Sequence, residues 1–515
     1  MDEDIIGGQP APRWHHAVLI GAPVLALGVV LFADLDPGHP EVTRTAAVAL
    51  LMAIWWLTGV APLAITALLP VILFPALGIL DAGDVASRYV NDVIFLFLGG
   101  FLVALAMQRW HLHRRIALRL LLFFGMRPRY MLMGFMLPTF FLSMWISNTA
   151  TTMMIVPIAM AIIMRFEEDH QGNGAFQRYA VGLLLGIAYS ASIGGVATLI
   201  GTPPNLAFSR ILTEMFPEAP EITFANWFVF GFPLALVLLG ILWVVLSTVF
   251  CRGTEGFHLD RSVIREQYTA LGPMTPEEKM IAAVFAALAL LWLTRPGLEI
   301  GGFHLLGWAS LFSNPSLVKD GTVAIAMAVL LFLLPSTTRP GERVMTWHAA
   351  HDLPWDIILL LGGGFALAAG FQTSGLSAWV GAQLDTLGRL HPLALVMIIC
   401  LAVSLLTELT SNTATSQVIL PIIAALAVRI GLHPLLLMIP ATLACSFAFM
   451  LPVATPPNAI VFGTRRLRVP DMLHTGLAFN LVGILLITLA TFTLGRLVFG
   501  IELDEVPAWS ALDGR

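Results

Sequence analysis

Charged residues are scarce in this chain of 515 residues: Asp, Glu, Lys and Arg make up 11% of it, while 58% is hydrophobic. A soluble protein of this length carries far more charge, so the composition indicates a helical membrane protein with many spans. The net charge is −5 and there is no basic tract, so we expect no nucleic-acid partner. Cys251, Cys400 and Cys445 are too scattered for a disulfide framework or a C-x-x-C metal site.

The opening residues, MDEDIIGGQPAPRWHH, lack the basic segment that begins a cleaved signal peptide. We therefore expect the apolar run that follows, at 17–32, to be the first membrane span. Further apolar runs of spanning length bring the predicted spans to eleven. These runs lie at 46–56, 60–77, 93–107, 180–200, 228–250, 281–293, 322–334, 357–371, 435–451 and 477–498.

Two more apolar segments, 131–164 and 395–430, are too long for one clean span and contain nearly identical polar sextets. SNTATT begins at Ser147 and SNTATS begins at Ser411. Hydroxyl and carboxamide groups are costly in hydrocarbon unless something binds them. Irregular backbone at that depth is tolerated only where it lines a polar cavity. Each segment is therefore predicted to be a re-entrant hairpin, two helices that enter and leave by the same face around a polar tip.

An internal repeat relates the two hairpins. DVIFLFLGGFLVALAMQ begins at Asp92, and DIILLLGGGFALAAGFQ begins 264 residues later at Asp356. The same offset separates Ser147 from Ser411. An odd number of crossings lies between the copies, so we expect inverted repeats, as in many secondary transporters, with the two hairpin tips meeting near the midplane. The predicted division is a tail and first span at 1–40, a first repeat at 41–250, a cytoplasmic loop at 251–279, a second repeat at 280–500 and an extracytoplasmic tail at 501–515.

The distribution of basic residues predicts the orientation. If the N-terminus is inside, the inward loops hold 18 of the 27 Lys and Arg residues. We therefore expect a cytoplasmic N-terminus and an extracytoplasmic C-terminus in a bacterial inner membrane, with the inward-opening hairpin at 131–164 and the outward-opening one at 395–430.

A second matched motif follows each SNT: GTPPN at Gly201–Asn205 and ATPPN at Ala454–Asn458. Two prolines break a helix in a span, and the freed carbonyls, with Asn and hydroxyl oxygens, suit Na⁺. Half-helix N-termini attract an anion. No Lys or Arg lies in either motif, so bound cations would supply the positive charge for the anion. One cation site is predicted at Ser143, Ser147, Asn148 and Gly201, its mate at Thr407, Ser411, Asn412 and Ala454, and hydrogen bonds to a shared anion from Asn148, Thr149, Asn412 and Thr413.

Other interpretations compete with this one. A single polar triplet in a span often only joins packed helices, but two copies at a repeat offset favour a binding site. Glu408, beside the second SNT, is either buried and paired or close to the cation site. His348 and His351 have helical spacing for a metal but no further ligand. A channel would need a continuous polar lining, and an embedded enzyme would need convergent His, Asp or Cys residues in the spans.

The paired SNT motifs, the segment CSFAFMLPVATPPNAIV at 445–461 and WWLTGVAPLAITALLP at 55–70 resemble the divalent anion/sodium symporter family. The resemblance implies an all-α fold of about eleven transmembrane helices plus two re-entrant hairpins, and a homodimer whose mobile domain moves like an elevator against a scaffold. It implies Na⁺ symport of a C4-dicarboxylate such as succinate and no enzyme activity. Sulfate or citrate transport, or exchange, are its alternatives. It places the first Na⁺ site at Ser143, Ser147, Asn148 and Gly201, the second at Thr407, Asn412 and Ala454, and the substrate at Asn148, Thr149, Asn412 and Thr413 with Thr202, Thr455 and Pro456 nearby.

Overall fold

A computed structural model describes residues 13–125, 127–169, 174–254, 262–300, 303–503 and 505–510, so the predicted tails and the loop at 251–279 lie partly outside the described residues. Within these ranges the chain is helical apart from one antiparallel hairpin of β1 (Gly297–Ile300) and β2 (Phe303–Leu306), in which Gly297 pairs with Leu306. Seven of the described helices are long and apolar enough to cross a membrane, and four shorter helices are also apolar. The prediction of a helical membrane protein is confirmed.

The helices follow one another along the whole chain. The first half contains α1 (Arg13–Phe32), α2 (Pro40–Thr58), α3 (Leu63–Ala67), α4 (Leu69–Ala76), α5 (Ala82–Ser87), α6 (Asp92–Arg109), α7 (Leu112–Phe123), α8 (Pro128–Ser143), α9 (Asn148–Asp169), α10 (Gly174–Val196), α11 (Pro203–Met215) and α12 (Phe224–Phe250). The second half contains α13 (Ser262–Ala270), α14 (Pro276–Thr294), α15 (Asp320–Leu333), α16 (Trp355–Ser374), α17 (Leu376–Gln383), α18 (Pro392–Thr407), α19 (Asn412–Arg429), α20 (Pro434–Cys445), α21 (Pro456–Gly463), α22 (Val469–Ala490) and α23 (Arg496–Phe499). Short helical turns are η1 (Trp308–Leu311), η2 (Pro315–Leu317), η3 (Trp347–Asp352), η4 (Asp385–Arg389), η5 (Thr491–Gly495) and η6 (Ala508–Ser510).

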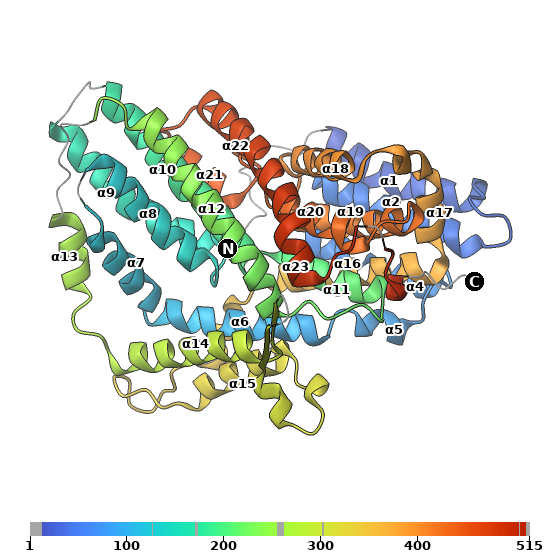
Figure 1. The fold of residues 1–515 in the computed structure, drawn as a ribbon, viewed down its shortest axis with the longest axis horizontal. Helices are drawn as coiled ribbons and strands as arrows, with labels where there is room; N and C mark the ends of the chain where they lie inside the picture. Colours follow the sequence, from blue (N-terminus) through green and yellow to red (C-terminus); the bar gives the residue numbers. More distant parts are fainter. Residues whose placement is uncertain are drawn as a thin grey trace.

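Three of the helices form one edge of the molecule. In Figure 1, α6, α14 and α15 lie along the lower edge, and α8, α9, α10 and α12 form a tilted group above them. Glycine allows α6 and α15 to approach closely, because a Cβ at Gly99 would lie only 2.5 Å from the backbone of Ala324. Of the seven described helices long enough to cross a membrane, α10 is the most buried, and it packs against neighbours such as α8 and α12. It is therefore a core helix that carries its C-terminal break into the interior.

The triple glycine at 362–364 serves helix packing. A Cβ on Gly363 would overlap the backbone of Ala67 in α3, and one on Gly364 would overlap the side chain of Gln417 in α19. Only glycine permits both approaches, so α16 packs directly against α3 and α19.

One predicted span differs from the structure. The apolar run at 60–77 forms two helices, α3 and α4, which meet at Leu68. Pro70 lies in the first turn of α4 and has no N–H to continue the α3 ladder, so the chain restarts the helix there. The hydropathy of the run is continuous, so it could not reveal this break.

The two ends of the molecule carry different charge networks. At one end, here called the basic end, Arg109 bonds to Glu342 at 2.9 Å and Arg115 bonds to Glu278 at 2.7 Å. At the opposite end, here called the tail end, α6 begins and α11 finishes, and the ring of Trp509 lies 5.6 Å from that of Phe216. The last described segment, η6 (Ala508–Ser510), therefore lies at this end. The two ends give a frame for locating the cavities.

Candidate functional site

The first polar tip is the turn between α8 and α9, at residues 144–147. The Ser143 hydroxyl, at the end of α8, donates to Asn148 Oδ1 at 2.5 Å. Ser147 Oγ accepts the backbone N–H of Ala150 at 3.2 Å, so it satisfies one free donor at the start of α9. The turn is held to the α10 break because Thr198 Oγ1 donates to the carbonyl of Met144 at 2.5 Å. The tip is thus an ordered polar structure and not a kink in one long helix.

The break between α10 and α11 is closed by an asparagine. The Asn205 amide donates to the carbonyls of Gly195 at 3.1 Å and Thr198 at 2.8 Å. Both carbonyls lie where the α10 ladder ends, so this one side chain replaces two lost backbone partners. The prolines at 203–204 occupy the first turn of α11, where the missing N–H is harmless.

The second repeat builds the same pattern with its own residues. Thr407 Oγ1 lies 2.7 Å from Asn412 Oδ1, as Ser143 does from Asn148 in the first repeat. The Asn458 amide donates to the carbonyls of Ala448 and Leu451, each at 3.0 Å. Asn458, Ala448 and Leu451 follow Asn205, Gly195 and Thr198 by the same 253 residues. The sequence repeat is therefore also a repeat of hydrogen bonds.

Glu408 supports the break between α20 and α21. Its carboxylate accepts the backbone N–H groups of Met450 at 2.9 Å and Leu451 at 3.0 Å, and the Asn480 amide at 2.9 Å. The side chain is buried, and these three donors supply the partners that a buried carboxylate requires. The position 264 residues earlier is Met144, so the first repeat has no such group. Glu408 thus stabilises the second break alone.

The two tips and the two breaks meet at one cavity of about 580 Å³. Four helix N-termini, those of α9, α11, α19 and α21, lie at its wall. Helix N-termini carry free N–H groups and partial positive charge, and so form an anion-binding surface. Among the described residues, no Lys or Arg lines the cavity, and Asp356 is its only acidic residue. The predicted residues that line it are Ser147, Asn148, Thr149, Gly201, Thr202, Ser411, Asn412, Thr413, Ala454, Thr455 and Pro456.

Two of the predicted residues lie behind the cavity wall. Ser143 and Thr407 are fully buried and reach the cavity only through their bonds to Asn148 and Asn412. Their hydroxyls therefore fix the direction of the two carboxamides.

Several residues that line the cavity escaped the sequence reasoning. Trp56, Gly59, Phe97 and Phe101 belong to α2, its end and α6, and Asp356 opens α16. Trp56 and Gly59 lie in the WWLTGVAPLAITALLP segment, and Phe97, Phe101 and Asp356 lie in the two repeat copies, but no polar pattern marks them as binding residues. Asp356 follows η3, which contacts α6.

Gly195 and Gly201 bring two backbones together beside Asn148. A Cβ on Gly201 would lie 2.5 Å from the carbonyl oxygen of Gly195, and a Cβ on Gly195 would lie 2.9 Å from Asn148 Oδ1. The close approach places backbone carbonyls near a carboxamide oxygen, which is an arrangement of oxygen atoms suited to a hard cation. Gly195 is a further residue of the site, in the GGVATLIG stretch that precedes the GTPPN motif.

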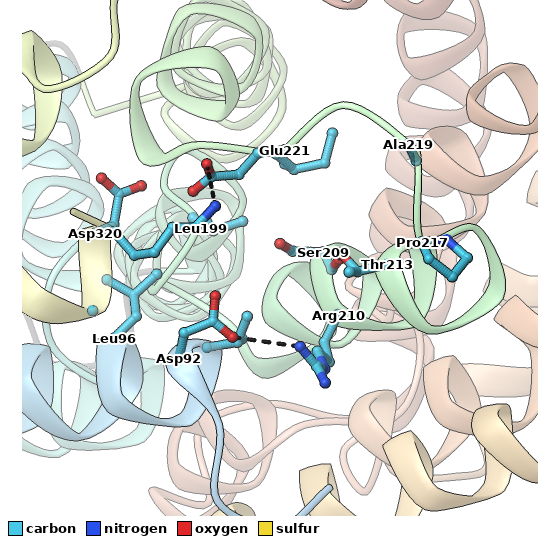
Figure 2. Close-up of a pocket in the computed structure, with 14 residues that line it drawn as sticks. Asp92, Leu96, Leu199, Ser209, Arg210, Thr213, Pro217, Ala219, Glu221 and Asp320 are labelled. Carbon is cyan, nitrogen blue, oxygen red and sulfur yellow. Dashed lines mark hydrogen bonds and ion pairs between the residues drawn. The ribbon is translucent and has the colours of Figure 1, made fainter. Parts of the chain in front are cut away.

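A smaller cavity, of about 160 Å³, lies at the tail end between α6, α11 and α15. Figure 2 shows Asp92 and Arg210 turned toward each other across it, and their atoms are 3.4 Å apart. Glu221 bonds to Lys319 at 2.8 Å and to Arg295 at 2.9 Å. The first pair joins α11 to the start of α6, and the Glu221 pairs join the loop after α11 to the end of α14 and the start of α15, so ion pairs link these elements at the tail end.

Comparison with known proteins places the chain in a family. A family model described as the sodium:sulfate symporter transmembrane region matches residues 15–501. The chain belongs to this family. The resemblance inferred from the SNT and TPPN motifs is confirmed. The family consists of transporters, so this symporter-family chain is a transporter and not an enzyme, as predicted.

Relatives match the symporter-family chain along nearly its whole length. The sodium-dependent dicarboxylate transporter SdcS of Staphylococcus saprophyticus is 41% identical over 492 residues, which cover 95% of this chain and 92% of SdcS. The human Na(+)/dicarboxylate cotransporter 3 is 39% identical over 576 aligned positions, which cover 96% of this chain and 93% of the human cotransporter. The solved structure of MtrF from Neisseria gonorrhoeae has a TM-score of 0.54 at 14% identity, covering 92% of this chain and 98% of MtrF. MtrF shares the fold alone.

Proposed function

We propose that this transporter carries a C4-dicarboxylate such as succinate into the cell by Na⁺-coupled symport across the bacterial inner membrane. The observation that carries the proposal is the cavity of about 580 Å³ at which four helix N-termini converge, with no basic side chain among its described lining residues. Its size lies in the range of small-molecule sites. The names of SdcS and the human cotransporter support a dicarboxylate as the substrate and sodium as the coupling ion.

The anion would lie between the two tips. Asn148 and Thr149 begin α9, and Asn412 and Thr413 begin α19, so each tip offers N–H groups and a helix dipole to one carboxylate. Thr202, Thr455 and Pro456, at the starts of α11 and α21, would contact the same substrate. A molecule with a carboxylate at each end matches this two-sided arrangement better than a single compact anion does.

Two Na⁺ ions would supply the positive charge that the cavity lacks. The first ion would use Ser143, Ser147, Asn148 and the backbone of Gly201, and the second would use Thr407, Ser411, Asn412 and the backbone of Ala454. The repeated Ser/Thr–Asn bond and the repeated Asn–carbonyl clamp support two related sites. Because each ion lies close to the anion, its binding raises the affinity for the anion, and by linkage the anion raises the affinity for the ion.

An elevator movement fits the arrangement of helices. The mobile part would be α8–α12 with α18–α22, moving against a scaffold that includes α6, α14 and α15, with the hairpins in opposite orientation as inverted repeats predict. Ion pairs close the tail end, so this conformation would be closed on the extracytoplasmic side if the basic end is cytoplasmic. The N-terminus would then be cytoplasmic and the C-terminus extracytoplasmic. A homodimer is proposed from the family resemblance.

Uptake by proteoliposomes tests this function. Purified transporter should accumulate labelled succinate when Na⁺ is higher outside, and should not do so when K⁺ replaces Na⁺ on both sides. Excess unlabelled succinate should compete strongly, whereas sulfate and citrate should compete weakly.

Three results would contradict the proposal. Uptake without a Na⁺ gradient that depends on internal dicarboxylate would indicate exchange. Stronger competition by sulfate or citrate would indicate another substrate. An electrical current far above carrier turnover would indicate a channel.

A further inference from the structure

A third cavity lies at the basic end and shares no lining residue with the cavity at the SNT tips. It has a volume of about 460 Å³ and lies between the start of α10, the end of α12 and the loop that leads into α22. Four arginines line it, one on α10 and three in the loop. They are Arg178, Arg465, Arg466 and Arg468. No motif discussed above accounts for this concentration of positive charge.

Only two of the four guanidinium groups have a carboxylate partner among the described residues. Arg466 makes a two-pronged pair with Glu167, at 2.6 and 2.7 Å, and Arg468 pairs with Asp471 at 3.2 Å. Among the described residues, Arg178 bonds to the carbonyl of Arg252 at 3.5 Å, and Arg465 has no carboxylate partner. The described carboxylates around the cavity therefore neutralise two of its four positive charges, and an anionic occupant would neutralise the others.

The loop brings its arginines to the cavity directly after α21 ends. Arg465 has φ of 60° and is the first residue beyond the helix cap, a position where a left-handed residue commonly ends a helix. Its N–H bonds to the carbonyl of Phe462 at 3.0 Å. Arg465 and Arg466 both line the cavity. Arginines that only orient a protein in a membrane do not need to line a cavity.

Apolar helix faces continue from this cavity along the protein surface. Leu473, Leu477 and Leu481 are exposed at four-residue spacing on α22, and Val237 and Val244 are exposed on α12, which packs beside α22. Phe250 and Val181 contribute apolar lining at the cavity itself. A ligand with an anionic head and long apolar chains satisfies both parts of this surface. A small aqueous anion would use only the arginines.

We propose that this cavity binds the phosphodiester headgroup of an anionic phospholipid, with acyl chains along the exposed faces of α12 and α22. Guanidinium groups match phosphate oxygens in charge and in planar hydrogen-bond geometry. Basic pockets between membrane helices at the cytoplasmic surface suit such headgroups. Because α10 carries the break at the transport cavity, the bound lipid would stabilise a part of the protein that the proposed transport function uses, although lipid binding itself does not depend on that function.

Thermal unfolding of the purified full-length protein in zwitterionic detergent tests the proposal. Phosphatidylglycerol should raise the Tm of the wild type in a saturable way, and phosphatidylcholine should not. The Arg178→Gln/Arg465→Gln double variant should bind phosphatidylglycerol about tenfold or more weakly, because it loses two charge-assisted contacts. A matched control is Arg119→Gln/Arg129→Gln, which removes the same charge from exposed arginines outside the cavity and should respond like the wild type.

Three outcomes would overturn the proposal. The first is an unchanged phosphatidylglycerol response in the double variant. The second is an equal loss in the control variant, which would show a general effect of surface charge. The third is an equal rise in Tm with inorganic phosphate or glycerol phosphate, which would identify a site for aqueous anions. If the double variant does not fold, the wild type can be tested with a bound spin-labelled anionic lipid. Phosphatidylglycerol should displace this lipid in a saturable way, and a lack of such displacement would contradict the proposed site.

Discussion

Replacing Gly195 with alanine probes the first cation site by a single methyl group. The added Cβ would lie 2.9 Å from Asn148 Oδ1 and 3.1 Å from both Asn148 Nδ2 and the carbonyl oxygen of Gly201. Ordinary contact between such atoms needs more room, so the Asn148 carboxamide must leave its position against Ser143, where the hydrogen bond is 2.5 Å long. The carboxamide can move away without a shift of the backbone, because the atom nearest to the added Cβ is at the tip of a side chain. The proposed cation ligands move while the helices stay in place.

The size of the effect follows from the packing. Adding one methyl group to a close-packed site costs about 1–3 kcal/mol. If this cost appears as weaker cation binding, the affinity for Na⁺ falls about 5- to 150-fold. The second site should be unaffected, because the matched position in the second repeat is already Ala448. The Gly195→Ala variant should therefore require a higher Na⁺ concentration for half-maximal succinate uptake.

The assay is succinate uptake by proteoliposomes over a range of Na⁺ concentrations. Gly240→Ala provides the matched control, since a Cβ on this α12 glycine meets no atom within 4 Å. It should behave like the wild type. A half-maximal Na⁺ concentration for Gly195→Ala within a factor of two of the wild type, in protein that elutes and melts normally, would refute the proposed role of Asn148 and Gly201 in cation binding.

Three further predictions concern other parts of the molecule. Glu408→Gln should lower stability by about 1–3 kcal/mol, seen as a lower Tm, because the new NH₂ group cannot accept one of the buried N–H donors. Cysteines introduced as Asp92→Cys and Arg210→Cys, joined by a reducible bis-thiosulfonate reagent, should block uptake while Na⁺-dependent succinate binding persists, because those helices must separate in an elevator movement. Burial opposes ionisation of Glu277, but hydrogen bonds from Thr338, Ser336 and Thr337 outweigh it and lower its pKa to about 2. Its stabilising contribution is therefore complete above its ordinary value of 4.5 and is lost as the pH falls toward 2, so Glu277→Gln should show a smaller fall in Tm than the wild type from pH 5 to pH 3.

Each of these predictions has a control and a contrary result. Glu218→Gln, at an exposed carboxylate, should leave Tm unchanged. If Glu408→Gln also left Tm unchanged, Glu408 would not stabilise the second break. Reduction of the cross-link should restore uptake, and full uptake by completely cross-linked protein would exclude separation of α6 from α11. The native cysteines are buried, so little background labelling is expected. Identical pH profiles for the wild type and Glu277→Gln would show that the Glu277 hydrogen bonds do not control acid stability.

The sequence predicted the helical membrane class and the two polar motif pairs because both depend on local composition and on an exact offset. The TPPN repeat also implied that Asn205 and Asn458 occupy equivalent positions in the two halves and make matching hydrogen bonds. Helix ends were less predictable, since α8 begins at Pro128 and α2 at Pro40, beyond the apolar runs. Polar residues continue these helices past the hydrophobic stretch, so hydropathy alone places the ends too far inward.

Contacts between distant segments could not be predicted from one sequence. Phe97 and Trp56 line the main cavity, and although each lies in a segment that the sequence analysis singles out, nothing distinguishes them from the other aromatic residues there. Glu408 stands out in the sequence as an acid beside the second SNT motif. Its partners at 450, 451 and 480 could not be predicted, because they depend on how α20 ends and where α22 packs. Gly195 is similar, since its importance arises from an approach to Asn148 across a different pair of helices.

Equilibrium binding of succinate, measured by calorimetry in Na⁺ and with choline replacing Na⁺, tests the central claim most directly when it is applied to the wild type, Asn148→Ala and Asn412→Ala. The account predicts binding by the wild type only in Na⁺, and loss of that binding in each single variant although the protein still folds, because both tips hold the same anion. Wild-type affinity in either variant, or undiminished binding in choline, would contradict it.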